Sequence, residues 1–231
     1  MSSNNSSKAQ SLWERLITAL RDHAESLVLA VIFAVLVRSF VFSAFRVQSE
    51  AMRPTLWQGD LVLGYRLPFG LAIPWSNQRL GGARVPGRGD LVVIHCPDAD
   101  RLCLMRVVGL PGDRIEMTHQ RLVINDIPCH YSSRGEGEEF IELDESYQDK
   151  SWPIRIAKSW QNESWPPQIV PPHAIFVLND FRSEQRDSRK WGAVDSSALL
   201  AEPVYLLASF DWSVRRGLPR LRPGRFFTRL N

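Results

Sequence analysis

The chain has 231 residues, of which 44% are hydrophobic and 23% are charged, so it is long enough for one or two domains with a sizeable core. A formal net charge of +3 is too small to indicate binding to nucleic acid, and we expect no nucleic-acid partner. The locally basic residues 215–225 contain prolines and glycines that argue against a helix in a groove, so they are interpreted as a solvated tail or as a contact for anionic lipid headgroups.

The N-terminal residues predict a membrane anchor. Residues 1–23 are mostly polar and include three Lys or Arg residues, whereas residues 24–45 are mostly apolar. About 20 residues are needed to cross the core of a bilayer, and the apolar segment reaches that length if Arg38 extends toward an interface. By the positive-inside rule we expect residues 1–23 to be a cytoplasmic tail and residues 24–45 to be an uncleaved transmembrane anchor. A helix buried in the core of the protein is the alternative.

After residue 45 the apolar residues follow a different period. Short apolar or alternating runs are separated by glycine and proline, which is typical of β-strands joined by turns. The pair Asn125-Asp126 lies between two such runs and predicts a hairpin turn. We therefore expect an all-β domain over residues 46–231, with strands at residues 60–65, 90–95, 104–109, 114–117, 121–124, 175–178 and 204–208.

Residues 131–170 interrupt this pattern. They are acidic, rich in tryptophan and proline, and show no clear periodicity. The sequence predicts an insertion in the β domain at this place.

The chain has three cysteines, which cannot all pair within one molecule. Cys96 and Cys103 flank a predicted turn at residues 97–101 and could form a disulfide if their strands pair in a suitable register. The sequence leaves that pairing open. There is no C-x-x-C pattern and the five histidines are scattered, so we expect neither a metal site nor a cofactor.

Several short motifs follow one another in a fixed order. Residues 48–56 read Gln-Ser-Glu-Ala-Met-Arg-Pro-Thr-Leu directly after the apolar segment, and further motifs lie at residues 38–47, 86–93, 106–113 and 179–192. With these motifs the chain resembles the type I signal peptidases, which cut leader peptides from exported proteins. The resemblance implies a signal-peptidase-type all-β domain of short antiparallel strands behind one N-terminal transmembrane helix. It also implies a single-pass protein of the bacterial inner membrane whose C-terminal domain is extracytoplasmic.

The resemblance further implies a serine–lysine dyad, in which a desolvated, neutral lysine accepts the proton of the serine hydroxyl. In this chain Ala51 stands at the nucleophile position and Met105 at the base position. Gln185 replaces the serine that hydrogen-bonds the lysine. Glu50 replaces a small glycine and brings a carboxylate to the place where negative charge would develop. The resemblance therefore predicts a pseudoenzyme with no catalytic residue.

Ser49 matches the family serine that helps form the oxyanion hole, and it is the nearest spare hydroxyl to the nucleophile position. Two residues along an extended strand correspond to about 6–7 Å, and Ser49 would also need a base. An active enzyme with an unrecognised dyad that uses Ser49 stays an alternative. The resemblance assigns Asp180, Asp187 and Arg189 to an ion-paired support under the site.

The resemblance also implies an apolar groove in which a peptide strand is bound by main-chain hydrogen bonds. Four apolar side chains could line this groove or could instead fill the core, namely those of Phe45, Val47, Met52 and Leu104. The leading hypothesis is a membrane-anchored pseudoenzyme that binds exported preproteins or their signal peptides, or that assists an active signal peptidase or another assembly partner. The alternatives are an active signal peptidase and a scaffold that binds a protein partner through residues 131–170.

Overall fold

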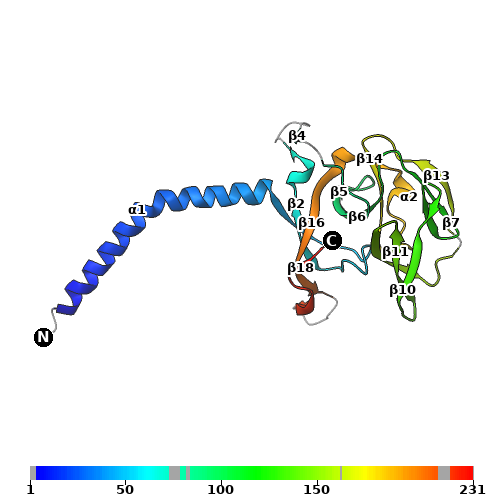
Figure 1. Ribbon diagram of the computed structural model, residues 1–231. Helices are drawn as coiled ribbons and strands as arrows, with labels where there is room; N and C mark the ends of the chain where they lie inside the picture. Colours follow the sequence, from blue (N-terminus) through cyan, green and yellow to red (C-terminus); the bar gives the residue numbers. More distant parts are fainter. Residues whose placement is uncertain (1–3, 73–78, 82–83, 162, 213–218, 231) are drawn as a thin grey trace. The chain divides into compact units, whose positions relative to one another are not determined.

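The computed structural model describes residues 4–72, 79–81, 84–161, 163–212 and 219–230 (Figure 1). The chain divides into two compact units, Met1–Phe42 and Ser43–Asn231. Part of the basic segment, residues 215–218, lies outside the described residues.

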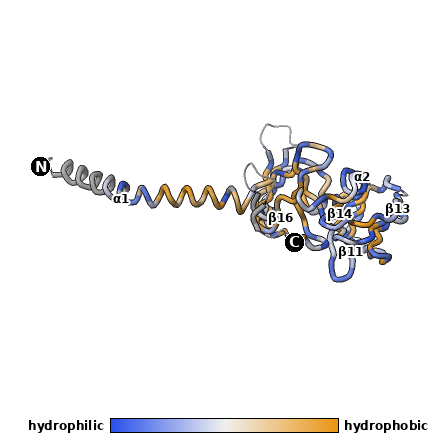
Figure 2. The backbone as a smooth tube through the Cα atoms, turned by 90° about the horizontal axis from the view of Figure 1, so that it is seen from above, coloured by the Kyte–Doolittle hydropathy of each residue, from blue (hydrophilic) through white to orange (hydrophobic). Residues whose placement is uncertain are grey.

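The first unit is one long helix, α1, which spans Asn4–Phe40. Its sequence contains neither proline nor glycine, the two residues that disfavour a helix most. Apolar residues fill its second half (Figure 2), where Leu27 is 63% and Phe33 is 68% exposed. The helix begins within the residues expected to be a tail, and it ends before residue 45 because Phe42–Arg46 forms a strand. In the part of the chain that the structure describes, no helix is both long enough and apolar enough to cross a membrane.

The main sheet has nine strands. Its order is β1-β2-β16-β5-β6-β14-β15, and β17 and β18 also pair with β16. Every pair in it with a defined register is antiparallel, so the prediction of a mainly β domain of antiparallel strands is confirmed. The strands are β1 (Phe42–Arg46), β2 (Asp60–Tyr65), β5 (Leu91–His95), β6 (Leu102–Gly109), β14 (Ala174–Leu178), β15 (Val194–Asp195), β16 (Leu199–Asp211), β17 (Arg220–Leu221) and β18 (Thr228–Arg229).

Two smaller sheets lie beside each other at one end of the second unit (Figure 1). One has the order β13-β7-β8-β9 and the other the order β10-β11-β12. Their strands are β7 (Arg114–Thr118), β8 (Arg121–Ile124), β9 (Ile127–Pro128), β10 (His130–Glu136), β11 (Phe140–Tyr147), β12 (Lys150–Ala157) and β13 (Trp165–Ile169). The remaining elements are β3 (Leu71–Ala72), β4 (Arg79–Leu80), α2 (Ser188–Trp191) and the 3-10 turns η1 (Leu67–Phe69), η2 (Ser196–Ala198) and η3 (Pro223–Arg225).

Residues 131–170 are more regular than their sequence predicts, since they contain most of β10 and all of β11, β12 and β13. In β12 the buried Trp152 and Ile154 do alternate with less buried neighbours. The alternation is obscured because Pro153 lies between them and because a buried charge, Glu145, occupies an inward position of β11. Strands rarely contain a proline or a carboxylate that faces the core, so the sequence did not predict β11 and β12.

Three clusters of buried side chains fill the second unit. One lies between the two smaller sheets and includes Trp152. The second contains Met105, and the third contains Val47 and Met52 with Leu104 packed against it. Met105 and Leu104 contact different clusters because successive side chains of a strand point to opposite faces.

Two of the predicted turns are confirmed. Asn125 and Asp126 have φ angles of 51° and 65°, and the strands on either side pair antiparallel, as a two-residue hairpin requires. The β5–β6 hairpin is closed by a disulfide between Cys96 and Cys103, whose Cα atoms are 5.5 Å apart. The third cysteine, Cys129, is a buried free thiol, and burial raises its pKa to about 12.

Candidate functional site

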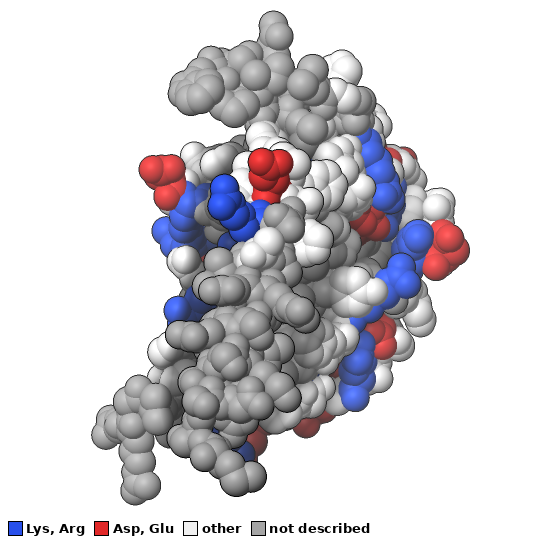
Figure 3. Space-filling view, turned by 90° about the vertical axis from the view of Figure 1, so that its left-hand side faces the viewer, with Lys and Arg blue, Asp and Glu red and all other residues white. Residues whose placement is uncertain are grey.

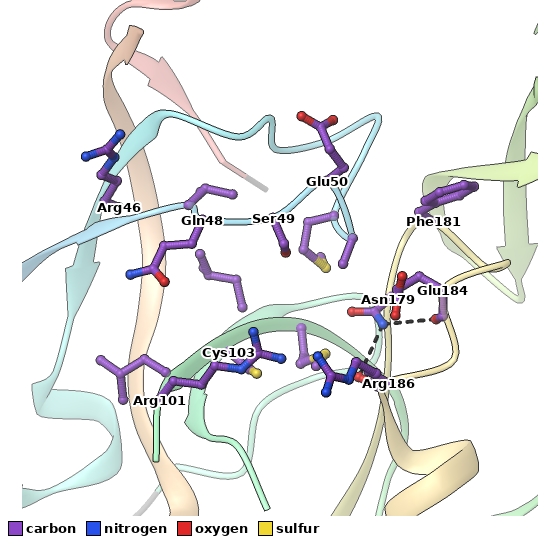
Figure 4. Close-up of a pocket in the computed structure, with 16 residues that line it drawn as sticks. Arg46, Gln48, Ser49, Glu50, Arg101, Cys103, Asn179, Phe181, Glu184 and Arg186 are labelled. Atoms are coloured by element: carbon purple, nitrogen blue, oxygen red, sulfur yellow. Dashed lines mark hydrogen bonds between the residues drawn. The ribbon is translucent and has the colours of Figure 1, made fainter. Parts of the chain in front are cut away.

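A cavity of about 210 Å³ lies between three segments of the second unit (Figure 4). The segments are residues 46–52 from the end of β1 onward, residues 101–105 around the start of β6, and residues 179–186 after β14. The structure thus brings together most of the site residues expected from the sequence, which are Val47, Ser49, Ala51, Met52, Leu104 and Met105.

Phe45 is the exception among the expected groove residues. It lines an adjoining cavity instead, which shares Arg46, Gln48 and residues 101–104 with the first one. Its ring packs on Gly64 of β2, where an added Cβ would lie 2.5 Å from Phe45 Cε2. The close packing requires a glycine at position 64.

Val47 and Met52 line the cavity and also belong to the core, with exposed fractions of only 3% and 2%. These two residues therefore lie at the boundary between the cavity and the core. The apolar side of the cavity is the edge of a packed core cluster, so its shape is fixed by the fold.

Main-chain hydrogen bonds fix the position of Ala51. The Phe181 N–H donates to the Ala51 carbonyl oxygen at 2.9 Å, and the Arg53 N–H donates to the Glu50 carbonyl oxygen at 3.0 Å. The loop after β1 is thus held against residues 179–186 by its backbone. The methyl group of Ala51 is not needed for these contacts.

Met105 is 3% exposed and packs in the same apolar cluster as Val92, its cross-strand partner, and Trp191. Such surroundings lower the pKa of a buried lysine, because they disfavour its charged form. The environment that a neutral amine base requires is present at position 105, and a thioether occupies it.

Glu50 belongs to the lining of the cavity beside Ser49, but its charge is compensated. Its carboxylate forms an ion pair with Arg53. Figure 4 shows the Glu50 side chain pointing away from the cavity and the Ser49 side chain pointing toward it. Among the described residues that line the cavity there is no lysine and no histidine that could deprotonate Ser49.

Asp180 is fully buried and forms a two-point ion pair with Arg106. Arg106 Nε lies 2.6 Å from Asp180 Oδ1, and Nη2 lies 2.7 Å from Oδ2. Thr55 Oγ1 donates to the same carboxylate, and Arg106 Nη1 donates to the Gly89 carbonyl oxygen at 2.6 Å. This network joins β6, the loop after β1 and the segment after β14. Arg106 was not foreseen as a site residue, although it directly follows the base position.

Asp187 and Arg189 form a second, separate ion pair. Arg189 Nε and Nη2 donate to the two carboxylate oxygens of Asp187 at 2.9 and 2.7 Å. Asp187 also caps α2 and accepts a hydrogen bond from the Asn179 N–H at 3.1 Å. The three residues expected to support the site therefore take part in two ion pairs. Gln185 lies outside the cavity, is exposed, and donates to Glu163 at 3.2 Å.

Asn179 is a residue of the cavity that the sequence did not single out. It is 1% exposed, and its Nδ2 donates to the carbonyl oxygens of Glu184 and Arg186 at 3.0 and 3.3 Å. Because two carbonyl oxygens require the NH2 group on that side, the orientation of the amide is fixed. Its Oδ1 has no hydrogen-bond partner and points into the cavity (Figure 4).

Charged residues surround the mouth of the cavity. Arg46, Arg101 and Arg186 are exposed there, and Arg186 lies 3.7 Å from the carboxylate of Asp98. On the face shown in Figure 3, basic and acidic side chains lie next to one another.

The family of the chain follows from a family model and from curated relatives. A family model described as "Signal peptidase, peptidase S26" matches residues 20–207. Signal peptidase I of Pseudomonas fluorescens is 33% identical over 169 residues, which cover 70% of this chain and 60% of that protein. Signal peptidase I of Buchnera aphidicola subsp. Baizongia pistaciae is 28% identical over 229 residues, covering 78% of this chain and 73% of that protein. A crystal structure of a signal peptidase I from Enterococcus faecalis V583 aligns with a TM-score of 0.33 and 21% identity over 52% of this chain and 97% of that one.

Proposed function

Because the chain belongs to the signal peptidase family, peptidase S26, we propose that it is a member that binds the leader peptides of exported proteins without cutting them. Peptide-bond hydrolysis by a serine–lysine dyad needs a hydroxyl nucleophile and a base that removes its proton. The single observation that carries the proposal is that Ala51 and Met105 line one cavity, where they offer a methyl group and a thioether.

The cavity retains features that suit an extended peptide. Met52, Leu104 and Met105 give it an apolar side for small side chains, and the unpaired Oδ1 of Asn179 can accept a hydrogen bond from a peptide N–H. An extended peptide satisfies such acceptors with its main chain and places alternate side chains in pockets. These features support binding, and the missing dyad opposes cleavage.

The alternative of catalysis by Ser49 has one observation in its favour, since the Ser49 side chain faces the cavity (Figure 4). Its hydroxyl would have to be deprotonated by a residue other than lysine or histidine, because the described residues of the cavity include neither. The Ser49 hydroxyl is weakly acidic, so without a base it is a poor nucleophile. We therefore place Ser49 in binding, where it donates to a peptide carbonyl oxygen.

We also propose that the mostly apolar residues 24–45 anchor the chain in the bacterial inner membrane as a single pass, with the β domain on the extracytoplasmic side. Residues 27–37 are all apolar, and three basic residues precede them in the sequence. Centrifugation of the full chain with membranes, followed by an alkaline carbonate wash, tests this. Release of the chain by carbonate would contradict an anchor.

The test of function uses the full chain and a leader peptide that carries a photo-crosslinker beside its cleavage site. We expect the wild type to crosslink at the cavity and to leave the peptide intact. Ala51→Ser and Met105→Lys alone should also leave it intact, whereas the double variant should cut it, because nucleophile and base act as one unit.

Other outcomes separate the competing functions. Cleavage by the wild type that Ser49→Ala abolishes would identify an active enzyme. Cleavage that no serine substitution changes would indicate a contaminating peptidase. Absence of both crosslinking and cleavage would favour the scaffold that binds through residues 131–170.

A further inference from the structure

The three-stranded sheet β10-β11-β12, here called the inserted sheet, is joined to the cavity at Ala51, here called the peptide cavity, by residues 179–183, here called the bridging segment. On its cavity side this segment contributes Asn179 and Phe181 to the lining, and the Phe181 N–H donates to the Ala51 carbonyl oxygen at 2.9 Å. On its other side it contacts the inserted sheet. The bridging segment therefore belongs to the cavity wall and to the packing of the sheet at once.

Main-chain hydrogen bonds attach the bridging segment to β12. The Arg155 N–H donates to the Asp180 carbonyl oxygen and the Arg182 N–H donates to the Arg155 carbonyl oxygen, each at 2.8 Å. These two bonds make a parallel β-bridge. A little further along both segments, the Ala157 N–H donates to Ser183 Oγ at 2.8 Å. The register of the bridging segment against the inserted sheet is thus fixed by hydrogen bonds.

The ring of Phe181 packs on the inserted sheet. Its centroid is 5.5 Å from that of Phe140 on β11, and the two rings meet edge to face at 79°. Aromatic rings prefer this arrangement, so Phe140 restricts where Phe181 can lie. Figure 4 shows the Phe181 side chain pointing away from the peptide cavity. The residue therefore bonds to the cavity loop with its main chain and to the inserted sheet with its ring.

A buried ion pair makes a second side-chain connection. Arg182 of the bridging segment and Glu145 of β11 are each 1% exposed, and Arg182 Nη2 donates to the Glu145 carboxylate. Through Nη1 the same guanidinium donates to the Asn179 carbonyl oxygen at 2.7 Å. Tyr131 and Trp152 donate to the Glu145 carboxylate at 2.8 Å each and hold it in place. The guanidinium therefore ties a residue of the peptide cavity to a fixed carboxylate of the inserted sheet.

We propose that the inserted sheet sets the shape of the peptide cavity, with Phe140 and Glu145 as positioning residues. Neither of them lines the cavity, so they act through the bridging segment. Loss of either contact lets this segment move away from Ala51, and the wall that contains Asn179 then no longer fits a peptide strand. The expected effect on peptide binding rests on the proposed function, whereas the expected effect on the bridging segment does not.

The first measurement is amide hydrogen exchange in the full chain, resolved to single residues. The exchange rate of the Phe181 amide reports on its hydrogen bond to the Ala51 carbonyl oxygen. We expect Phe140→Leu to raise that rate roughly fivefold, as loss of an edge-to-face ring pair predicts, while the amides of β2 keep their rates. Phe210→Leu makes the same change on β16, outside the inserted sheet, and should leave the Phe181 amide unchanged. An unchanged Phe181 amide in Phe140→Leu overturns the proposal, and so does an equal rise throughout the β domain, which is the pattern of a general loss of stability.

Arg182→Lys tests the ion pair while it keeps the positive charge opposite Glu145. One ammonium group replaces two separate guanidinium nitrogens, so the hydrogen bond to the Asn179 carbonyl oxygen should be lost. We expect the exchange rate of the Phe181 amide to rise roughly fivefold, the value of about one hydrogen bond. Arg134→Lys, at a side chain of the inserted sheet that is 47% exposed, is the matched control and should leave that rate unchanged. A wild-type rate in Arg182→Lys would overturn the positioning role of the ion pair.

Peptide binding gives the second readout. A fluorescence titration with a leader peptide should show roughly fivefold weaker binding to both test variants, Phe140→Leu and Arg182→Lys, and unchanged binding to both controls. Either test variant is sufficient if the other does not fold. Unchanged affinity in the test variants overturns the proposal. A wild type that binds no leader peptide contradicts the proposed function instead, and the amide exchange rates then decide the positioning role on their own.

Discussion

The main-chain N–H of Phe181 donates a hydrogen bond to the carbonyl oxygen of Ala51 over 2.9 Å. The next residue back along the chain, Asp180, is held by Arg106 of β6. The loop that carries the nucleophile position is thus connected by backbone and ion pair to the strand that carries the base position. The nucleophile position and the base position are therefore held near each other by residues that are not part of the dyad.

Removing one partner of the Arg106–Asp180 pair should be strongly destabilising. Asp180→Asn leaves the guanidinium buried without a counter-charge, and we expect the free energy of unfolding to fall by about 3–5 kcal/mol in urea denaturation. Asp144→Asn at the exposed Arg134–Asp144 pair is the control and should change it by less than about 1 kcal/mol. Equal effects of the two substitutions would contradict the supporting role assigned to Asp180.

Gly64→Ala tests the packing of β2. Its new Cβ would lie 2.5 Å from Phe45 Cε2 and 3.0 Å from the Cβ of Ala201, so we expect a loss of about 1–3 kcal/mol of unfolding free energy. Gly135→Ala, whose Cβ meets nothing within 4 Å, should cost less than about 1 kcal/mol. Thermal and urea unfolding of both variants give the comparison, and equal losses would argue against the close contact.

Asn179→Gly removes the unpaired acceptor from the peptide cavity. If leader peptides bind there, their affinity should fall roughly fivefold, the value of about one hydrogen bond, in a fluorescence titration. Gln185→Ser changes the same segment outside the cavity and should leave the affinity unchanged. A drop in both variants would point to the segment as a whole, and no drop in Asn179→Gly would remove this acceptor from the binding site.

Loss of the Cys96–Cys103 disulfide should destabilise the β domain. A cross-link between residues seven apart restricts the unfolded chain, and the chain-entropy relation gives about 2–3 kcal/mol. The double variant Cys96→Ser/Cys103→Ser should match the reduced wild type in urea denaturation. Reductant should still lower the unfolding free energy of the Cys129→Ala variant, since Cys129 is a free thiol. A wild type that is indifferent to reductant would contradict the prediction.

The buried thiol of Cys129 predicts a dependence on alkaline pH. Its pKa is raised from 9.0 to about 12, first by burial and then by Glu145, so the thiol ionises more readily in the unfolded chain. The corresponding stability is complete below pH 9.0 and declines between 9.0 and about 12, with a limiting slope of about 1.4 kcal/mol per pH unit. Unfolding free energies of wild type and Cys129→Ala should therefore converge or cross as pH rises through this window. A constant difference would contradict it.

Much of the fold follows from local sequence signals. The strands at 60–65, 114–117 and 121–124 were predicted because apolar residues alternate or cluster between glycines and prolines, and the Asn125-Asp126 turn has the residues that positive φ angles require. The sheet β10-β11-β12 was missed because its face toward the core includes a charge, Glu145. That charge is acceptable only through its contacts with Arg182, Tyr131 and Trp152, and Arg182 is 37 residues away in the chain.

The site was predicted less completely than the fold. Ser49, Ala51 and Met105 were placed by motif positions, and they do line one cavity. Asn179 and Arg106 were not singled out, because an unpaired oxygen and a buried counter-ion are properties of the folded arrangement. The ion pair of Glu50 could not be predicted for the same reason, since its partner Arg53 and its outward direction depend on the turn between them.

The Cys96–Cys103 bridge lies at the tip of the strand pair whose second member supplies Leu104 and Met105 to the cavity. Disulfides persist in oxidising compartments and are rare where thiols are kept reduced. If the β domain lies on the extracytoplasmic side, as proposed above, a newly made copy would finish this wall only after that domain had crossed the membrane. On that proposal, formation of the binding site would require the same transport that delivers the proposed client.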